Sequence, residues 1–317
     1  MTFLRKDERG QAVVLMVLAL VVLLGMSAMV LDVGSWFRDQ RRLQGTADAA
    51  ALAGAQKLPN APSAAQTMAL SYANSNGGDV LGADISVGTL YQTNDIIDVK
   101  AQKNVPGFFS SVLGIMNADI SASARARVGP PLQAQYVAPM VVDCDHPLIK
   151  NCNEDTVPIF GQPTSLDYDP LGAPGAFGML NLGKNTNGNG TPNGTPGSSA
   201  EAAWILNGFS QYLDLGLYPS DPGAKFSSSN IQSALTARIG TVLLFPVFKT
   251  LSGTGQNAQY DIIAWIGFHL TDFTVQGNNA TLNGYFTEYI AHGILATGGN
   301  GGAPSSTWGV TSIQLIK

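Results

Sequence analysis

The sequence predicts an α+β protein. A single N-terminal transmembrane helix continues into an Ala-rich stalk helix, a small β-β-α-β module follows, and a β-rich C-terminal module ends the chain. Three observations predict this order. A long uncharged apolar run lies near the N-terminus, an alanine-rich helical pattern follows it directly, and alternating apolar residues fill much of the last third of the chain.

The composition of the 317 residues excludes several classes of protein. Charged residues make up 12% of the chain, about half the usual share of roughly 25%, and the net charge is −5. We expect no nucleic-acid partner, because phosphate contacts need clustered Lys and Arg. Two cysteines and three histidines leave little room for a zinc or iron–sulfur centre, so no cofactor is expected. The low charge favours an extracytoplasmic domain over a cytosolic enzyme.

The first element is a candidate membrane span. Ala12 to Leu31 are twenty consecutive uncharged residues, and a helix of that length covers the roughly 30 Å hydrocarbon core of a bilayer. We assign residues 11–32 to a transmembrane anchor and residues 1–10 to a cytoplasmic tail. The alternative is a cleavable signal peptide, whose apolar region is usually only about 7–15 residues long and ends at a small-residue site that is not evident here.

The orientation of this span follows from what lies on each side, because the flanking charges are balanced. Three basic residues precede the run and three follow it, so the positive-inside rule gives a tie. The first nine residues are too few to form a domain, and the closely spaced cysteine pair of the long C-terminal part suits an oxidising compartment. The N-terminus is therefore predicted to be cytoplasmic and the bulk of the chain extracytoplasmic.

The stalk helix covers Trp36 to Leu58 and carries a stripe of mostly small residues. The stripe repeats at intervals of three, four or seven residues and comprises Trp36, Leu43, Ala47, Ala50, Gly54 and Leu58. Two interpretations remain open: the stripe packs on the protein's own domain, or it contacts another subunit, since small residues let helices approach closely. Pro59 and Pro62 end this helix, and a second helix runs from Ser63 to about Ser75.

The rest of residues 33–128 reads as the small module. The expected elements are strands Val80–Leu90 and Ile96–Lys103, a short helix Val105–Met116 and a strand Asp119–Val128. Gly129-Pro130-Pro131 marks a boundary, and we assign residues 129–140 to a linker.

Two blocks of this region resemble TadG-like proteins of the tight-adherence (Flp) pilus-assembly system. The first block contains Arg9-Gly10-Gln11, Asp32-x-Gly34, Arg42-Leu43-Gln44 and the run Ala47 to Ala53, and the second extends from Ile97 to Val128 with a Val-Pro-x-Phe-Phe start. The resemblance implies a non-enzymatic accessory subunit anchored in the cell membrane. Its implied partners are the membrane and other pilus-assembly or pilin-like subunits, contacted through the span and the stalk. The candidate contact residues are Asp32, Leu43, Ala47, Asp48, Ala50 and Gly54.

The chain departs from the family pattern at two places. Pilins of this system carry Glu five residues after the processing Gly, but counting from Gly10 that position is Leu15, which favours an uncleaved accessory subunit over a pilus building block. Some relatives carry an adhesion domain with a D-x-S-x-S metal motif. Here Gly88 replaces the second Ser after Asp84, so no metal site is expected.

The C-terminal module, residues 141–317, is expected to be rich in strands. Helices are predicted at Ala200–Ser210 and Ser228–Arg238, and strands at Thr241–Lys249, where Pro246 requires an edge or a bulge, and at Tyr260–Leu270. A second alternating run covers Leu282 to Ile290. Residues 183–199, rich in Gly, Asn, Thr and Pro, are expected to form a mobile loop.

The two cysteines are the clearest covalent feature of this module. Seven residues with Pro147 separate Cys144 from Cys152, and such a segment can turn back to bring both Cα atoms within disulfide range. A metal site with His146 and a neighbouring Asp is the alternative, although this spacing matches no standard zinc pattern; free thiols are the third reading.

The other residues that could bind a metal or act in catalysis are better explained by structural roles. The Asn185, Asn187 and Asn189 spacing resembles a calcium loop but contains no carboxylate, and Asp167 and Asp169 read as a turn. Lone His269 on a strand, in a chain without a G-x-S-x-G elbow, does not indicate catalysis. A structural subunit is therefore the leading prediction; an adhesin or ligand-binding module on a membrane anchor is the alternative, and a tethered hydrolase the third.

Overall fold

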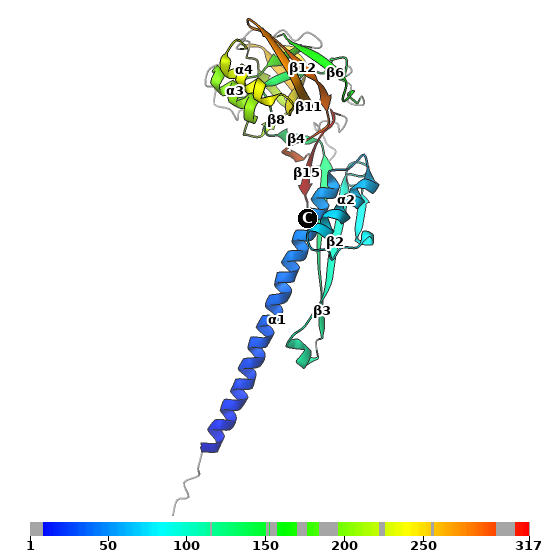
Figure 1. The fold of residues 1–317 in the computed structure, drawn as a ribbon, viewed down its shortest axis with the longest axis vertical. Coiled ribbons are helices and arrows are strands. Elements are labelled where there is room, and N and C mark those ends of the chain that lie inside the picture. The colour runs from blue at the N-terminus through cyan, green and yellow to red at the C-terminus, as the bar shows by residue number, and fades with distance from the viewer. Residues whose placement is uncertain are drawn as a thin grey trace, which may run out of the picture. The chain divides into compact units, whose positions relative to one another are not determined.

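The computed structural model describes residues 9–114, 116–149, 152, 157–169, 176–183, 196–221, 226–254, 257–295 and 308–316 (Figure 1). The chain divides into two compact units. Unit 1 comprises Met1–Arg127 and Leu315–Lys317, and unit 2 comprises Val128–Gln314. A long N-terminal helix and a strand-rich C-terminal part confirm the predicted mixed α+β class.

Unit 1 is built on helix α1, which runs without a break from Arg9 to Ala55. Its 47 residues give a rod about 70 Å long at 1.5 Å per residue, so the predicted span and stalk form one helix. Between residues 12 and 31 the side chains are exposed, with Ala28 alone half-buried. Among the described residues, this is the one helix long and apolar enough to cross a membrane.

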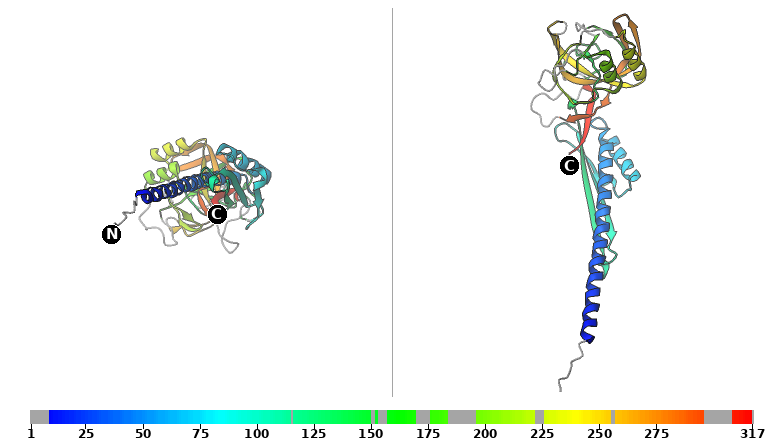
Figure 2. Two further views of the ribbon diagram at one scale, coloured as in Figure 1. Left: turned by 90° about the horizontal axis from the view of Figure 1, so that it is seen from below. Right: turned by 90° about the vertical axis from the view of Figure 1, so that its left-hand side faces the viewer.

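The C-terminal half of α1 packs into its own domain. Helix α2, Pro62–Ser75, lies alongside it (Figure 2) and presents the buried residues Ala65, Ala69 and Ala73. On the facing side of α1, Leu43, Ala47 and Ala50 are at most 1% exposed, a burial that the small side chains of both helices allow.

Gly54 shows how close this approach is. A Cβ atom added to Gly54 would lie 2.6 Å from Ile97 Cδ1 and 2.9 Å from the Ala65 carbonyl oxygen. The stripe of Leu43, Ala47, Ala50 and Gly54 is therefore an intramolecular packing face. The subunit-contact interpretation of these four residues is corrected, because their surface is already occupied by the same chain.

A three-stranded antiparallel arrangement completes unit 1. Strands β1 (Ile85–Gly88), β2 (Ile96–Pro106) and β3 (Asn117–Gly129) are adjacent in that order. β2 and β3 pair in register from Ile96↔Arg127 to Pro106↔Asn117. Alternate residues of this hairpin are buried, which is the pattern of a sheet with one covered face. The hairpin runs beside α1 toward its N-terminal half (Figure 1).

The segment between β2 and β3 differs from the sequence prediction. In place of a helix over Val105–Met116, β2 continues through Pro106 and the turn contains only η2, a four-residue 3₁₀ helix, Ser110–Leu113. The strand ladder is the reason. It extends to the pairs of Val105 and Pro106, and the Gly107 N–H then donates to the Met116 carbonyl at 2.9 Å, so few residues remain for a helix.

Unit 2 is a closed ring of six strands. The ring order is β10–β5–β7–β6–β12–β11, and pairing of β10 with β11 closes it. The strands are β5 (Met140–Asp143), β6 (Pro163–Tyr168), β7 (Ala176–Met179), β10 (Val242–Ser252), β11 (Gln259–Gln276) and β12 (Asn279–Thr287). The even-numbered residues from Tyr260 to Leu270 are all buried, as their alternation predicted. Phe245 stacks on Phe268 within the core, with ring centroids 5.2 Å apart.

Smaller elements surround this ring. β9 (Gly216–Pro219) pairs with β11, and β14 (Gly293–Leu295), β4 (Pro131–Ala134) and β8 (Leu213–Asp214) form a separate sheet. β13 (Tyr289–Ile290) pairs with β15 (Val310–Leu315), and the helices are α3 (Ser198–Asn207) and α4 (Ser229–Arg238).

Two expectations for unit 2 have clear outcomes. The bulge expected at Pro246 lies slightly later in the strand, because Pro246 pairs in register with Trp265 and the register of β10 against β11 shifts after Val247. The linker expected over residues 129–140 is instead structured, because it contains β4 and the buried residues Ala134 and Val137.

The packing of Gly54 gives the first prediction. Gly54→Leu should lower the free energy of unfolding of unit 1 by about 1–3 kcal/mol, the usual cost of overpacking, because the neighbouring backbone must move. Gly45→Leu is the matched control, since nothing lies within 4 Å of a Cβ atom added there. Amide hydrogen exchange of α2 in the full-length protein measures the effect. Equal protection in the two variants would contradict the close packing.

Candidate functional site

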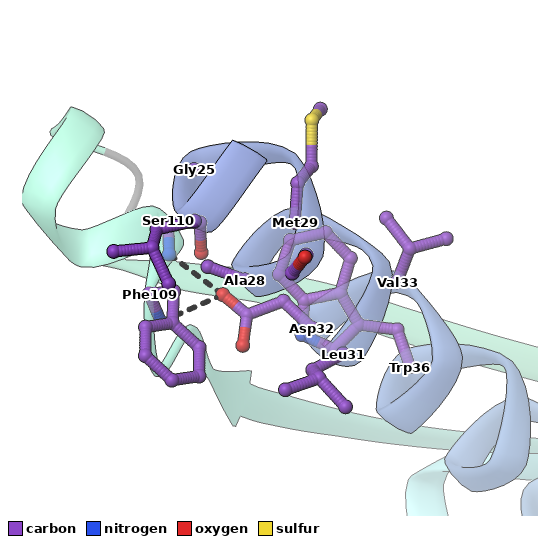
Figure 3. Close-up of a pocket in the computed structure, with 11 residues that line it drawn as sticks. Gly25, Ala28, Met29, Leu31, Asp32, Val33, Trp36, Phe109 and Ser110 are labelled. Carbon is purple, nitrogen blue, oxygen red and sulfur yellow. Dashed lines mark hydrogen bonds between the residues drawn. The ribbon is translucent and has the colours of Figure 1, made fainter. Parts of the chain in front are cut away.

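The candidate site of unit 1 centres on Asp32, where the apolar half of α1 ends. The Asp32 side chain reaches the tip of the β2–β3 hairpin, defined here as residues 107–116 (Figure 3). Oδ1 accepts the Phe108 N–H at 3.1 Å, and Oδ2 accepts those of Phe109 at 2.9 Å and Ser110 at 2.6 Å. One carboxylate thus fixes three consecutive backbone amides to the helix across 76 to 78 residues of sequence.

These contacts remove a charge from the helix surface. Asp32 is only 4% exposed, and the three backbone donors are the charge-assisted partners that a buried carboxylate requires. The next charged residue along α1 is Arg38, and Phe37 before it is 62% exposed. The outer surface of α1 is consequently apolar and uncharged from Ala12 to Phe37.

An open apolar groove lies between this part of α1 and the hairpin tip, and we call it the Asp32 groove. It has a volume of about 500 Å³ and is lined by Leu24, Gly25, Ser27, Ala28, Met29, Leu31, Asp32, Val33 and Trp36 of α1 and by Phe109 and Ser110 of the tip. The Trp36 Nε1 atom is buried and has no hydrogen-bond partner among the described residues. The groove is therefore a largely apolar surface.

The remaining stalk candidate, Asp48, is also engaged within unit 1. Gln44 Nε2 donates to Asp48 Oδ1 at 2.8 Å and to the Ser123 carbonyl at 3.1 Å, which ties α1 to β3. Asp32 and Asp48 both make contacts within unit 1, and the subunit contacts expected for them stay a prediction. Sequence reasoning noted both Asp32 and the Phe-Phe block but had no signal that joined them.

Unit 2 contains the Cys144–Cys152 disulfide, with Cα atoms 4.7 Å apart. The side chain of Asp143 lies close to both sulfur atoms, but the disulfide consumes the thiolates that the alternative metal site would need. Burial raises the pKa of the Asp143 carboxyl, which accepts the Asp145 N–H at 2.9 Å. The disulfide therefore has a structural role, since it closes the loop that follows β5.

The three histidines make structural contacts. His146 is 2% exposed, accepts the Leu148 N–H at Nδ1, and burial lowers its pKa. The His269 ring stacks on that of Tyr285 with centroids 4.7 Å apart, and His292 lies edge-on to Tyr136. These contacts give each of the three histidines a structural role in packing.

The two other polar candidates have separate outcomes. Asp167 lies within β6, where a turn was expected, and accepts the Thr281 hydroxyl at 2.7 Å. Asp169 follows the end of the strand, and its N–H donates to the Phe177 carbonyl. The calcium-like run Asn185, Asn187 and Asn189, and most of the expected loop 183–199, lie outside the described residues.

Comparison with known families finds a match for the helix that carries Asp32. Residues 10–57 match the Tad family model, described as "Putative Flp pilus-assembly TadE/G-like". Over these residues the long helix is similar to the TadE/G-like family. The matched range covers the apolar run, Asp32 and the packed stripe of the TadE/G-like helix, and it ends before α2. No curated protein and no solved structure matches the chain.

The contacts of Asp32 give the second prediction. Asp32→Leu removes all three acceptor contacts, so the amides of Phe108, Phe109 and Ser110 should exchange hydrogen much faster than in the wild-type protein. Asp32→Asn keeps one carbonyl oxygen and should give an intermediate rate. Asp98→Leu is the control, because Asp98 pairs with Arg125 higher on the same hairpin. Unchanged exchange at the tip of Asp32→Leu would show that the carboxylate does not hold it.

His146 gives a prediction about pH. Burial favours neutral imidazole, so the folded state binds fewer protons than the unfolded state and unit 2 should lose stability as pH falls below about 6.5. His146→Asn retains an acceptor but does not titrate there. From pH 7 to pH 5, the melting temperature of the wild type should therefore fall steadily relative to that of His146→Asn. The exposed His292→Asn serves as the control, and parallel profiles for wild type and His146→Asn would contradict this role.

Proposed function

We propose that the protein is a membrane-anchored accessory subunit of a Flp-type pilus or secretion assembly and is not an enzyme. One observation carries the proposal. The TadE/G-like match lies on a single helix whose first half is apolar and exposed and whose second half is built into a folded domain of the same chain. Such a helix supports an anchoring role, because one continuous helix would hold the folded domain at a fixed position relative to the membrane, with no flexible linker between them.

The accessory role, as opposed to that of a pilus building block, is supported by Leu15. Flp pilins carry a Glu at the corresponding position after the processing Gly, and here an exposed Leu stands there. An uncleaved N-terminal segment would keep the protein in the membrane while the pilus is assembled. The buried Leu43, Ala47 and Gly54 leave the exposed side chains of the apolar half as the contact surface for other membrane subunits.

The proposed orientation places the N-terminus in the cytoplasm, and it places unit 2 and the part of unit 1 that follows the span outside. The Cys144–Cys152 disulfide supports this orientation, since disulfides persist in oxidising compartments. A reporter enzyme that is active only outside the membrane should work when fused after Lys317. Activity of a cytoplasmic reporter at that position, with a silent outside reporter, would reverse the orientation.

The function is tested by deletion and complementation in the source cell. We expect the deletion strain to lose most surface pili and to regain them with the wild-type chain. A variant in which residues 12–31 are replaced by an unrelated apolar span of equal length should insert but restore pili poorly, because subunit contacts through the span are lost. Normal piliation of the deletion strain, with reduced surface adhesion, would favour an adhesin and contradict the assembly role.

A further inference from the structure

The hairpin tip carries an unusual surface for a domain outside a membrane. Phe108 is 82% exposed, Met116 71% and Phe109 45%, and residues 104–118 contain no charged side chain. Clustered exposed apolar side chains mark an interaction surface, because leaving them in water is unfavourable. The tip therefore requires a covering partner.

The position of the tip along α1 indicates what that partner is. Phe109 and Ser110 line the same groove as Leu24, which precedes Asp32 by eight residues, or about 12 Å of helix. The tip thus lies beside the last part of the apolar run that begins at Ala12. If this run crosses a bilayer, the tip is at the depth of the leaflet on the side of unit 1.

The length of the apolar surface agrees with this depth. Because Asp32 is buried, the uncharged outer surface of α1 extends from Ala12 to Phe37, 26 residues that measure about 39 Å. That length exceeds the roughly 30 Å hydrocarbon core and approaches the 40–45 Å that include the headgroups. Trp36, Phe37, Phe108 and Phe109 then lie near the interface, where aromatic residues are enriched.

We propose that the hairpin tip is a second membrane anchor, inserted into the leaflet on the side of unit 1, with lipid acyl chains filling the Asp32 groove. The groove continues the apolar surface of α1, and its one charged residue, Asp32, is buried and accepts hydrogen bonds from three backbone amides. This inference rests on α1 crossing the bilayer and not on the role in pilus assembly.

The test measures the depth of single labelled positions. Full-length protein is reconstituted in phosphatidylethanolamine–phosphatidylglycerol vesicles, and a fluorophore is attached to a cysteine at Phe108 or Met116. Nitroxide-labelled lipids quench fluorophores in the leaflet, and iodide quenches those in water. A cysteine at Leu20 reports the span, and one at Leu81, which is 67% exposed but distant in sequence from the tip, is the matched control.

The expected result is strong quenching by nitroxide lipids at Leu20, Phe108 and Met116, and quenching by iodide alone at Leu81. Asp32→Leu should reduce lipid quenching at Phe108 and leave Leu20 unchanged. If the label at position 108 is quenched by iodide while the label at position 20 is still quenched by nitroxide lipids, the second anchor is overturned and the transmembrane span is not. A Phe108 label that is reached by lipid in vesicles but shielded and crosslinked to another protein in native membranes would overturn lipid as the occupant.

Discussion

The structure of unit 1 depends on one buried carboxylate at the end of an apolar helix surface. Asp32 would place a charge beside lipid, and the amides of Phe108 to Ser110 would place unsatisfied donors there. Each alternative is costly, because neither a charge nor a free N–H finds water in a bilayer. Their mutual hydrogen bonds satisfy both and fix the hairpin to the helix. A polar pair thereby allows the surrounding surface to remain apolar.

The two halves of α1 suit different surroundings because they expose and bury different side chains. Large apolar side chains from Val13 to Leu31 are exposed, which suits lipid. Beyond Asp32, the buried Ala47, Ala50 and Gly54 bring α2 and β2 close to the helix axis. The continuous α1 therefore couples the position of its apolar half directly to the folded part of unit 1.

Sequence patterns within short windows predicted the helices and strands whose formation depends on neighbouring residues. The length of the apolar run and the alternation in β11 predicted the long apolar helix and the core strands. The periodicity of the stripe predicted a helical face but left open whether that face contacts the same chain or another subunit. The helix expected over Val105–Met116 was wrong because strand pairing with β3 competes for the same backbone. The Asp32 contact and the pairing of β5 with β10 join segments that are distant in sequence, and no pattern within a short window encodes such contacts.

The central claim is that Asp32 holds the hairpin tip beside the membrane half of α1, and a distance measurement tests it most directly. Spin labels at Met29 and Ser111, both exposed, are measured by pulsed electron resonance in full-length protein in lipid vesicles. We predict one short, narrow distance distribution that broadens in Asp32→Leu and is retained in Asp98→Leu. A broad distribution in the wild-type protein, unchanged by Asp32→Leu, would contradict the claim.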